Sequence, residues 1–134
     1  MPHIVKLAVN SVSCAAPFTQ KAAVAALEGP RDEVEAMVAE FGIRRRLIAD
    51  GLQSIPGVNC PEPEGAFYAF PSIKETGLTS IEFETKAMNE AGVALLSGSA
   101  FGEYGEGYVR LSYANSQENI QKAISQLDKM VRSL

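Results

Sequence analysis

The sequence of 134 residues contains no tryptophan, one histidine (His3) and two cysteines, Cys14 and Cys60. A lone histidine near a terminus provides no acid–base pair, and there is no Gly-x-Ser-x-Gly segment to carry a nucleophilic serine. The cysteines are far apart and lack Cys-x-x-Cys or Cys/His spacing, so neither a disulfide framework nor a zinc site is expected. The sequence therefore predicts a cytoplasmic protein with reduced thiols, no metal site and no complete catalytic constellation of its own.

Positive charge and long apolar runs are also scarce. The chain has 12 Lys and Arg against 16 Asp and Glu, and its net charge is −4. Nucleic acids and anionic membrane surfaces attract concentrated positive charge, but the one basic run, Arg44-Arg45-Arg46, lies between Glu40 and Asp50 and indicates a solvated helix face. No segment has the apolar length of a membrane span, and no secretion signal is recognisable. We therefore expect neither a nucleic-acid nor a membrane partner.

The composition that remains is that of one globular domain, with 46% hydrophobic and 21% charged residues. The clearest element is a helix between Pro30 and Pro56-Gly57. Within it, Glu40 and Arg44 have the spacing and order of a favourable ion pair. Its apolar residues recur at helical spacing: Val34, Met37, Val38, Phe41, Ile48 and Leu52.

The rest of the chain alternates short helices and strands. A helix is predicted over 20–27, whereas residues 3–13 show no clean period and Pro17 interrupts the pattern after them. Thr79 and Glu82 form a capping box that opens a helix ending near Gly92, and a last helix opens at Asn115 or Ser116. Strands are predicted over 66–71, 93–96 and 108–113. This order predicts an α/β fold, a two-layer sandwich in which helices cover a small sheet.

A loop over 97–107 contains glycines at positions 98, 102, 105 and 107, which allow the backbone to approach a ligand closely. Glycine loops that bind phosphate usually join a strand to a helix, whereas this loop joins two strands. Phosphate binding is therefore disfavoured, and an ordinary connecting loop remains the alternative.

Arg110 is the most informative residue because it lies in an apolar strand between Val109 and Leu111. A guanidinium there is costly unless it is paired, and its planar fork matches two carboxylate oxygens. Two other interpretations remain open from the residues alone. Arg110 could point to water from an edge strand, or it could form a structural ion pair with Glu82 or Glu84.

Several segments, in their order and spacing, resemble the C-terminal small-domain portion of aspartate aminotransferase-like (class I/II) pyridoxal-phosphate-dependent aminotransferases. They are Ser13-Cys14, Pro17-Phe18-Thr19-Gln20, Gly65-Ala66-Phe67-Tyr68, Ala91-Gly92-Val93-Ala94, Gly98-Ser99-Ala100-Phe101-Gly102 and Gly107 to Ala114. The resemblance implies that Arg110 binds the α-carboxylate of the substrate and that Phe101 lies near the substrate mouth. The family usually has proline where this chain has Ser97, which predicts a looser loop.

The resemblance also implies a parent enzyme that moves an amino group between an amino acid and a 2-oxo acid. The family's cofactor lysine lies on a Ser-Lys segment followed by Gly-Trp-Arg, and this chain contains neither. We therefore expect the chain alone to bind no pyridoxal phosphate and to be inactive. Residues 1–28 would border the missing large domain, and residues 29–134 would form the small domain.

Two alternatives remain. The chain could be a stand-alone regulatory module that binds an amino acid or another carboxylate through Arg110. It could also be a non-catalytic domain that self-associates, because the apolar residues of 3–27 lack cover without a large domain. A homo-oligomer is expected in that case.

Overall fold

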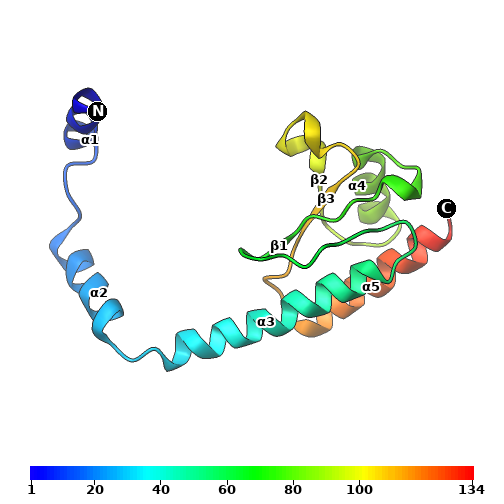
Figure 1. The fold of residues 1–134 in the computed structure, drawn as a ribbon, viewed down its shortest axis with the longest axis horizontal. Coiled ribbons are helices and arrows are strands. Elements are labelled where there is room, and N and C mark those ends of the chain that lie inside the picture. Colours follow the sequence, from blue (N-terminus) through cyan, green and yellow to red (C-terminus); the bar gives the residue numbers. More distant parts are fainter. The chain divides into compact units, whose positions relative to one another are not determined.

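The computed structural model describes all residues from Met1 to Leu134 (Figure 1). Its helices are α1 (Pro2–Ser11), α2 (Pro17–Glu28), α3 (Asp32–Gln53), α4 (Ser80–Asn89) and α5 (Gln117–Arg132), its strands are β1 (Tyr68–Ala69), β2 (Leu96–Ser97) and β3 (Val109–Ser112), and short 3₁₀ helices cover Lys74–Thr76, Gly98–Phe101 and Glu103–Gly105. The chain divides into two compact units, residues 1–36 and residues 37–134, with the division inside α3. No helix is both long enough and apolar enough to span a membrane.

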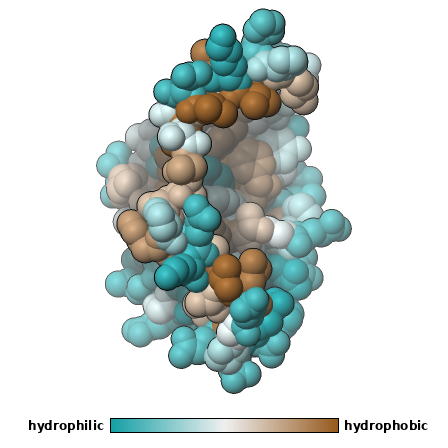
Figure 2. Space-filling model, turned by 90° about the vertical axis from the view of Figure 1, so that its left-hand side faces the viewer, coloured by the Kyte–Doolittle hydropathy of each residue, from teal (hydrophilic) through white to brown (hydrophobic).

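The N-terminal unit is helical and has no core of its own. Neither α1 nor α2 contains a buried residue, and neither helix has a hydrogen-bonded side-chain cap. Figure 2 shows hydrophobic side chains exposed on α1, at the top of the view. Residues 3–13, in which the sequence shows no regular apolar period, thus lie largely in helix α1. Pro17 begins α2 rather than interrupting it, because the first turn of a helix needs no N–H from that residue.

The C-terminal unit contains a three-stranded antiparallel sheet of order β1-β3-β2. Along β3 the side chains alternate, so that Val109 and Leu111 are buried while Arg110 and Ser112 face the other side. The buried face joins a hydrophobic core to which three helices contribute: Ile48 and Leu52 from α3, Phe83 and Ala87 from α4, and Ile120 and Leu127 from α5. The predicted two-layer α/β fold is confirmed, and the outer face of the sheet is free to carry a site.

The observed strands are shorter than the predicted ones. At 93–96 only Leu96 belongs to a strand, and pairing continues to Ser97. The Val93 N–H instead donates to the Ala87 carbonyl at 2.8 Å, which ties this segment to the end of α4. The loop over 97–107 contains two of the 3₁₀ helices, so it is more ordered than a simple connection.

The predicted helix starts agree more closely with the structure. The Thr79 hydroxyl accepts a hydrogen bond from the Glu82 N–H, and the Glu82 carboxylate accepts one from the Thr79 N–H, which confirms the capping box of α4. Ser116 caps α5 by accepting a hydrogen bond from the Asn119 N–H at 3.2 Å. Both caps satisfy backbone donors that the helix itself leaves free.

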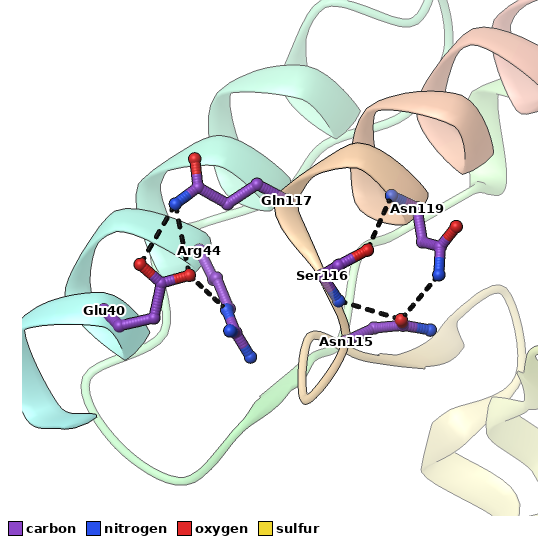
Figure 3. Close-up of polar contacts among 6 residues, drawn as sticks. All are labelled: Glu40, Arg44, Asn115, Ser116, Gln117 and Asn119. Atoms are coloured by element: carbon purple, nitrogen blue, oxygen red, sulfur yellow. Dashed lines mark hydrogen bonds and ion pairs between the residues drawn. The ribbon is translucent and has the colours of Figure 1, made fainter.

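A polar cluster joins α3 to the start of α5 (Figure 3). The Glu40 carboxylate accepts hydrogen bonds from the Gln117 amide at 3.0 and 3.1 Å and from the Arg44 guanidinium at 2.7 Å, which confirms the predicted Glu40–Arg44 pair. The hydrogen bond from Gln117, then that from Arg44, lowers the pKa of Glu40 below its ordinary value of 4.5. Met37 and Val38, which precede this junction, stay exposed despite lying on the predicted apolar stripe.

Candidate functional site

Arg110 lies on the central strand of the sheet, not on an edge. Its backbone is opposite Leu96 of β2, and β1 pairs along the other side of β3. Because Val109 and Leu111 face the core, the Arg110 side chain lies on the outer face. The interpretation as an edge-strand arginine is therefore wrong.

The Arg110 guanidinium lies between two aromatic rings. Its central carbon is 4.3 Å from the centre of the Tyr68 ring and 4.4 Å from the centre of the Phe101 ring. A cation over the face of an aromatic ring is attracted by the ring quadrupole, and two such contacts restrict the position of the guanidinium. The N–H groups at the rim of the guanidinium plane are left for a planar acceptor such as a carboxylate.

No acidic side chain of the chain forms an ion pair with Arg110. The two acids considered as partners are engaged elsewhere. The Glu82 carboxylate accepts the Thr79 N–H at 2.9 Å, and the Glu84 carboxylate accepts the Ser97 N–H at 3.0 Å. The interpretation as a structural ion pair is also wrong, which leaves the guanidinium available to a ligand.

An open pocket of about 180 Å³ borders Arg110. Its walls are formed by Tyr68, Ala94, Leu95, Leu96, Arg110 and Ser112. Arg110 is the only charged residue among them, and most of the others are apolar. The arrangement suits a small ligand with one carboxylate at the arginine and an apolar part against the β2 segment.

Phe101 reaches this site from the 3₁₀ helix that follows β2. Its ring also meets Phe70 edge to face, with the ring centres 6.0 Å apart. Phe70 stacks on Tyr108 at 5.6 Å, and the Lys74 ammonium lies 4.8 Å from the centre of the Tyr108 ring. The structure thus brings Arg110 and Phe101 together and surrounds them with further aromatic side chains.

The loop that carries Phe101 is fastened at both ends. At its start the Ser97 N–H donates to Glu84, and at its end the Ser80 hydroxyl accepts hydrogen bonds from the N–H groups of Gly107 at 2.8 Å and Tyr108 at 3.2 Å. The expectation that Ser97 makes this loop looser did not consider the hydrogen bond that the Ser97 N–H donates to Glu84. A proline at this position would have no N–H to donate. Ser97 is a point of attachment.

None of the chain's lysines borders the Arg110 pocket. Lys86 is paired with Glu90 at 2.9 Å, and Lys74 lies over Tyr108. An aldehyde cofactor held as a Schiff base needs an amine at the site. The residues present therefore do not by themselves fit pyridoxal phosphate. The structure also gathers no group of His, Cys, Asp and Glu side chains that could hold a metal ion.

Tyr68 is the site residue that the sequence did not reveal. It pairs with Ser112, two residues beyond Arg110 on the same face of the sheet, which brings its ring against the guanidinium. Alternation along a strand predicts which face of β1 carries Tyr68 and which face of β3 carries Arg110, each strand taken by itself. The missing information was which strands are neighbours and in what register.

Comparison with known proteins extends over nearly the whole chain. The family described as aminotransferase class I and II matches residues 3–127. The aspartate aminotransferase of Pyrococcus abyssi is 44% identical over 131 residues, which are 96% of this chain and 33% of that protein. A probable N-acetyl-LL-diaminopimelate aminotransferase of Bacillus subtilis is 42% identical over 129 residues, again 96% of this chain and 33% of that protein.

Solved structures agree in fold. An aromatic aminotransferase from Pyrococcus horikoshii is 40% identical, with a TM-score of 0.88 over 96% of this chain and 35% of that one. An aspartate aminotransferase from Thermus thermophilus, solved with maleate, is 30% identical, with a TM-score of 0.81 over 93% of this chain and 32% of that one. The chain thus spans about a third of the length of these relatives. A family match over residues 3–127, together with this similarity in sequence and fold, shows that the chain belongs to the class I and II aminotransferases.

Proposed function

We propose that this chain is the substrate-clamping small domain of an enzyme that transfers an amino group between an amino acid and a 2-oxo acid. Pyridoxal phosphate, the cofactor that the family implies, would serve as the electron sink of the complete enzyme. The observation that carries the proposal is Arg110, whose guanidinium lies over the rings of Tyr68 and Phe101 and has no acidic partner in the chain. Its role is to bind and orient the substrate carboxylate.

The chemistry of Arg110 fits this role. A guanidinium forms two parallel hydrogen bonds with a carboxylate, and this geometry fixes orientation as well as contributing affinity. The contacts with two rings restrict the position of the fork, and the open pocket admits the rest of the ligand. The similar Thermus thermophilus structure was solved with maleate, which is a dicarboxylate. Substrates with an α-carboxylate are therefore the ligands that we assign to Arg110.

The test is a titration of the 134-residue chain with 2-oxoglutarate, followed by NMR. We expect Arg110→Ala to weaken binding by roughly a hundredfold, because hydrogen bonds to a charged group are lost. Arg110→Lys should recover only part of the affinity, since an ammonium keeps the charge but not the planar fork. Arg46→Ala is the matched control, because Arg46 is exposed and forms no ion pair. Unchanged binding by Arg110→Ala would refute the proposal.

The same titration separates the enzyme fragment from a regulatory module. A small-domain piece that shares its substrate with a missing large domain should bind 2-oxoglutarate only at about millimolar concentration. Binding at micromolar concentration or tighter, lost in Arg110→Ala, would favour the stand-alone carboxylate-binding module instead.

The lysine positions lead to a second expectation for the chain alone. Because no lysine borders the Arg110 pocket, we expect the chain alone to form no stable Schiff base with pyridoxal phosphate and to catalyse no transamination. The measurement is intact mass after incubation with the cofactor and reduction with borohydride. A single reduced adduct at one lysine, formed at cofactor concentrations near that of the protein, would contradict this expectation.

For the N-terminal segment we propose that residues 1–28 border the large domain and residues 29–134 form the small domain. The support is the exposure of apolar side chains on α1 and α2, such as Leu7 and Phe18. Alone, the chain should self-associate through these side chains, and the complete enzyme should be a homo-oligomer that works in the cytoplasm. Light scattering tests the first point, since a clean monomer at high concentration would contradict it.

A further inference from the structure

Helix α4 supplies the attachments of the loop between β2 and β3. Ser80 lies in its first turn, and Glu84 lies four residues later on the same side of the helix. Ser80 is fully buried, and Ser97, which Glu84 holds, is 3% exposed. The helix therefore reaches the loop through two polar groups whose partners are shielded from water.

Glu84 holds the start of the loop, next to the strand residue that faces Arg110. Its carboxylate accepts the Ser97 N–H at 3.0 Å, and Ser97 directly follows Leu96, the residue opposite Arg110 across the sheet. Glu84 forms no ion pair, so this hydrogen bond is the only side-chain contact of its charge within the chain. A hydrogen bond to a carboxylate is stronger than one between neutral groups.

The loop between its attachments is closed on itself. Gly98 donates its N–H to the Tyr108 carbonyl at 2.8 Å. Gly98 and Gly105 lie so close that a Cβ on either one would collide with the backbone of the other. This close packing favours movement of the loop as one piece, so its attachments contribute to the position of Phe101.

We propose, resting on the role given above to Arg110, that Glu84 is a positioning residue for the carboxylate site. By accepting the Ser97 N–H, it orients the loop so that the Phe101 ring lies against the Arg110 guanidinium. Glu84 touches neither the guanidinium nor the ring, and it acts on the site only through the backbone of Ser97.

The test is a double-mutant cycle of Glu84→Ala and Ser97→Pro, made in the 134-residue chain. Proline suits the backbone at position 97, where φ is −55°, but it has no N–H to donate. The primary measurement needs no ligand. It is the ring-current shift of the Arg110 side-chain protons, to which the Tyr68 and Phe101 rings both contribute, and the change caused by Phe101→Leu gives the Phe101 part.

We expect Glu84→Ala to remove most of the shift that Phe101→Leu removes, and Glu84→Gln to retain it, because an amide oxygen still accepts the N–H. In the Ser97→Pro background, Glu84→Ala should have no further effect, since the hydrogen bond is already absent. Glu90→Ala, which removes an exposed acid at the end of the same helix, should leave the shift unchanged.

Two results would overturn the proposal. One is an Arg110 shift that is unchanged in Glu84→Ala while Phe101→Leu removes the Phe101 part of it. The other is an equal loss from Glu84→Ala in both backgrounds, which would mean that Glu84 acts without Ser97. Binding of 2-oxoglutarate should weaken roughly threefold to tenfold in Glu84→Ala, as expected for one indirect hydrogen bond. Because the shift is measured without ligand, failure of Arg110 to bind carboxylates would leave the Glu84 result interpretable.

Discussion

The two units of the chain contain similar apolar side chains but differ in whether these side chains are buried. Residues 37–134 bury aliphatic and aromatic side chains from three helices and a sheet in one core. In the N-terminal unit, α1 and α2 carry comparable apolar side chains, such as Leu7 and Leu27, and bury none of them. Apolar composition alone therefore does not produce a hydrophobic core. A core forms where several helices and strands pack their apolar faces against one another.

The helix ends differ in the same sense. Helices α4 and α5 have hydrogen-bonded side-chain caps at Thr79 and Ser116, whereas α1 and α2 have none. A helix with neither a buried face nor a cap gains little stability in water. The N-terminal helices thus lack both kinds of support, whereas Arg110 and the two rings that it contacts all lie in the C-terminal unit.

The largest expected difference comes from truncating one leucine in each unit. Leu127 is 1% exposed and Leu27 is 83% exposed. Leu127→Ala should lower the free energy of unfolding by about 3 kcal/mol, because it removes apolar contacts and leaves a cavity. Leu27→Ala should change it by less than about 0.5 kcal/mol. Urea unfolding followed by circular dichroism measures both, and equal losses would mean that α2 has a buried face after all.

The two cysteines offer the next contrast, since one lies in each unit. Cys14 is exposed and Cys60 is buried, and burial raises the pKa of the Cys60 thiol to about 11. Because the thiolate is the reactive form, a maleimide at pH 7 should label Cys14 at least about a hundredfold faster than Cys60. Mass spectrometry with time locates the label. In urea the two rates should converge, and equal rates in the native chain would show that the core around Cys60 opens readily.

A smaller effect is expected at the helix caps. Thr79→Ala removes the capping box of α4 and should cost about 1 kcal/mol in the free energy of unfolding. Ala16→Ser adds a cap to α2, whose N-cap residue already has a non-helical backbone, with φ −59° and ψ 144°. It should raise the helical signal of the chain slightly without changing that free energy. A loss of stability from Ala16→Ser would indicate that this position packs against other residues.

The smallest effect concerns pH. The pKa of Glu40 is lowered by its hydrogen bonds to Gln117 and Arg44, so its contribution to stability is complete above pH 4.5 and is lost as the pH falls further. Glu40→Gln should therefore be slightly destabilising at pH 7 and match the unaltered chain at strongly acid pH. Thermal unfolding at a series of pH values measures this, with Glu28→Gln as the control from the other unit. A difference that persists at acid pH would exclude the carboxylate charge as its cause.

The sequence predicts features that depend on neighbours along the chain. The capping box at Thr79, the ion pair of Glu40 with Arg44 and the central element of the site, Arg110 in an apolar strand, all follow from local spacing. Helix α1 could not be predicted, because its exposed residues need no regular apolar period. The aromatic rings around Arg110 could not be placed either, since they depend on strand register and on the path of the loop.

The attachment of the loop to α4 has a mechanical consequence. Glu84 holds its beginning and Ser80 holds its end, so both ends of the loop are tied to the same helix. These hydrogen bonds oppose a swing of the loop as a separate flap on a fixed helix. We therefore expect a displacement of the loop to carry α4 and β3 with it.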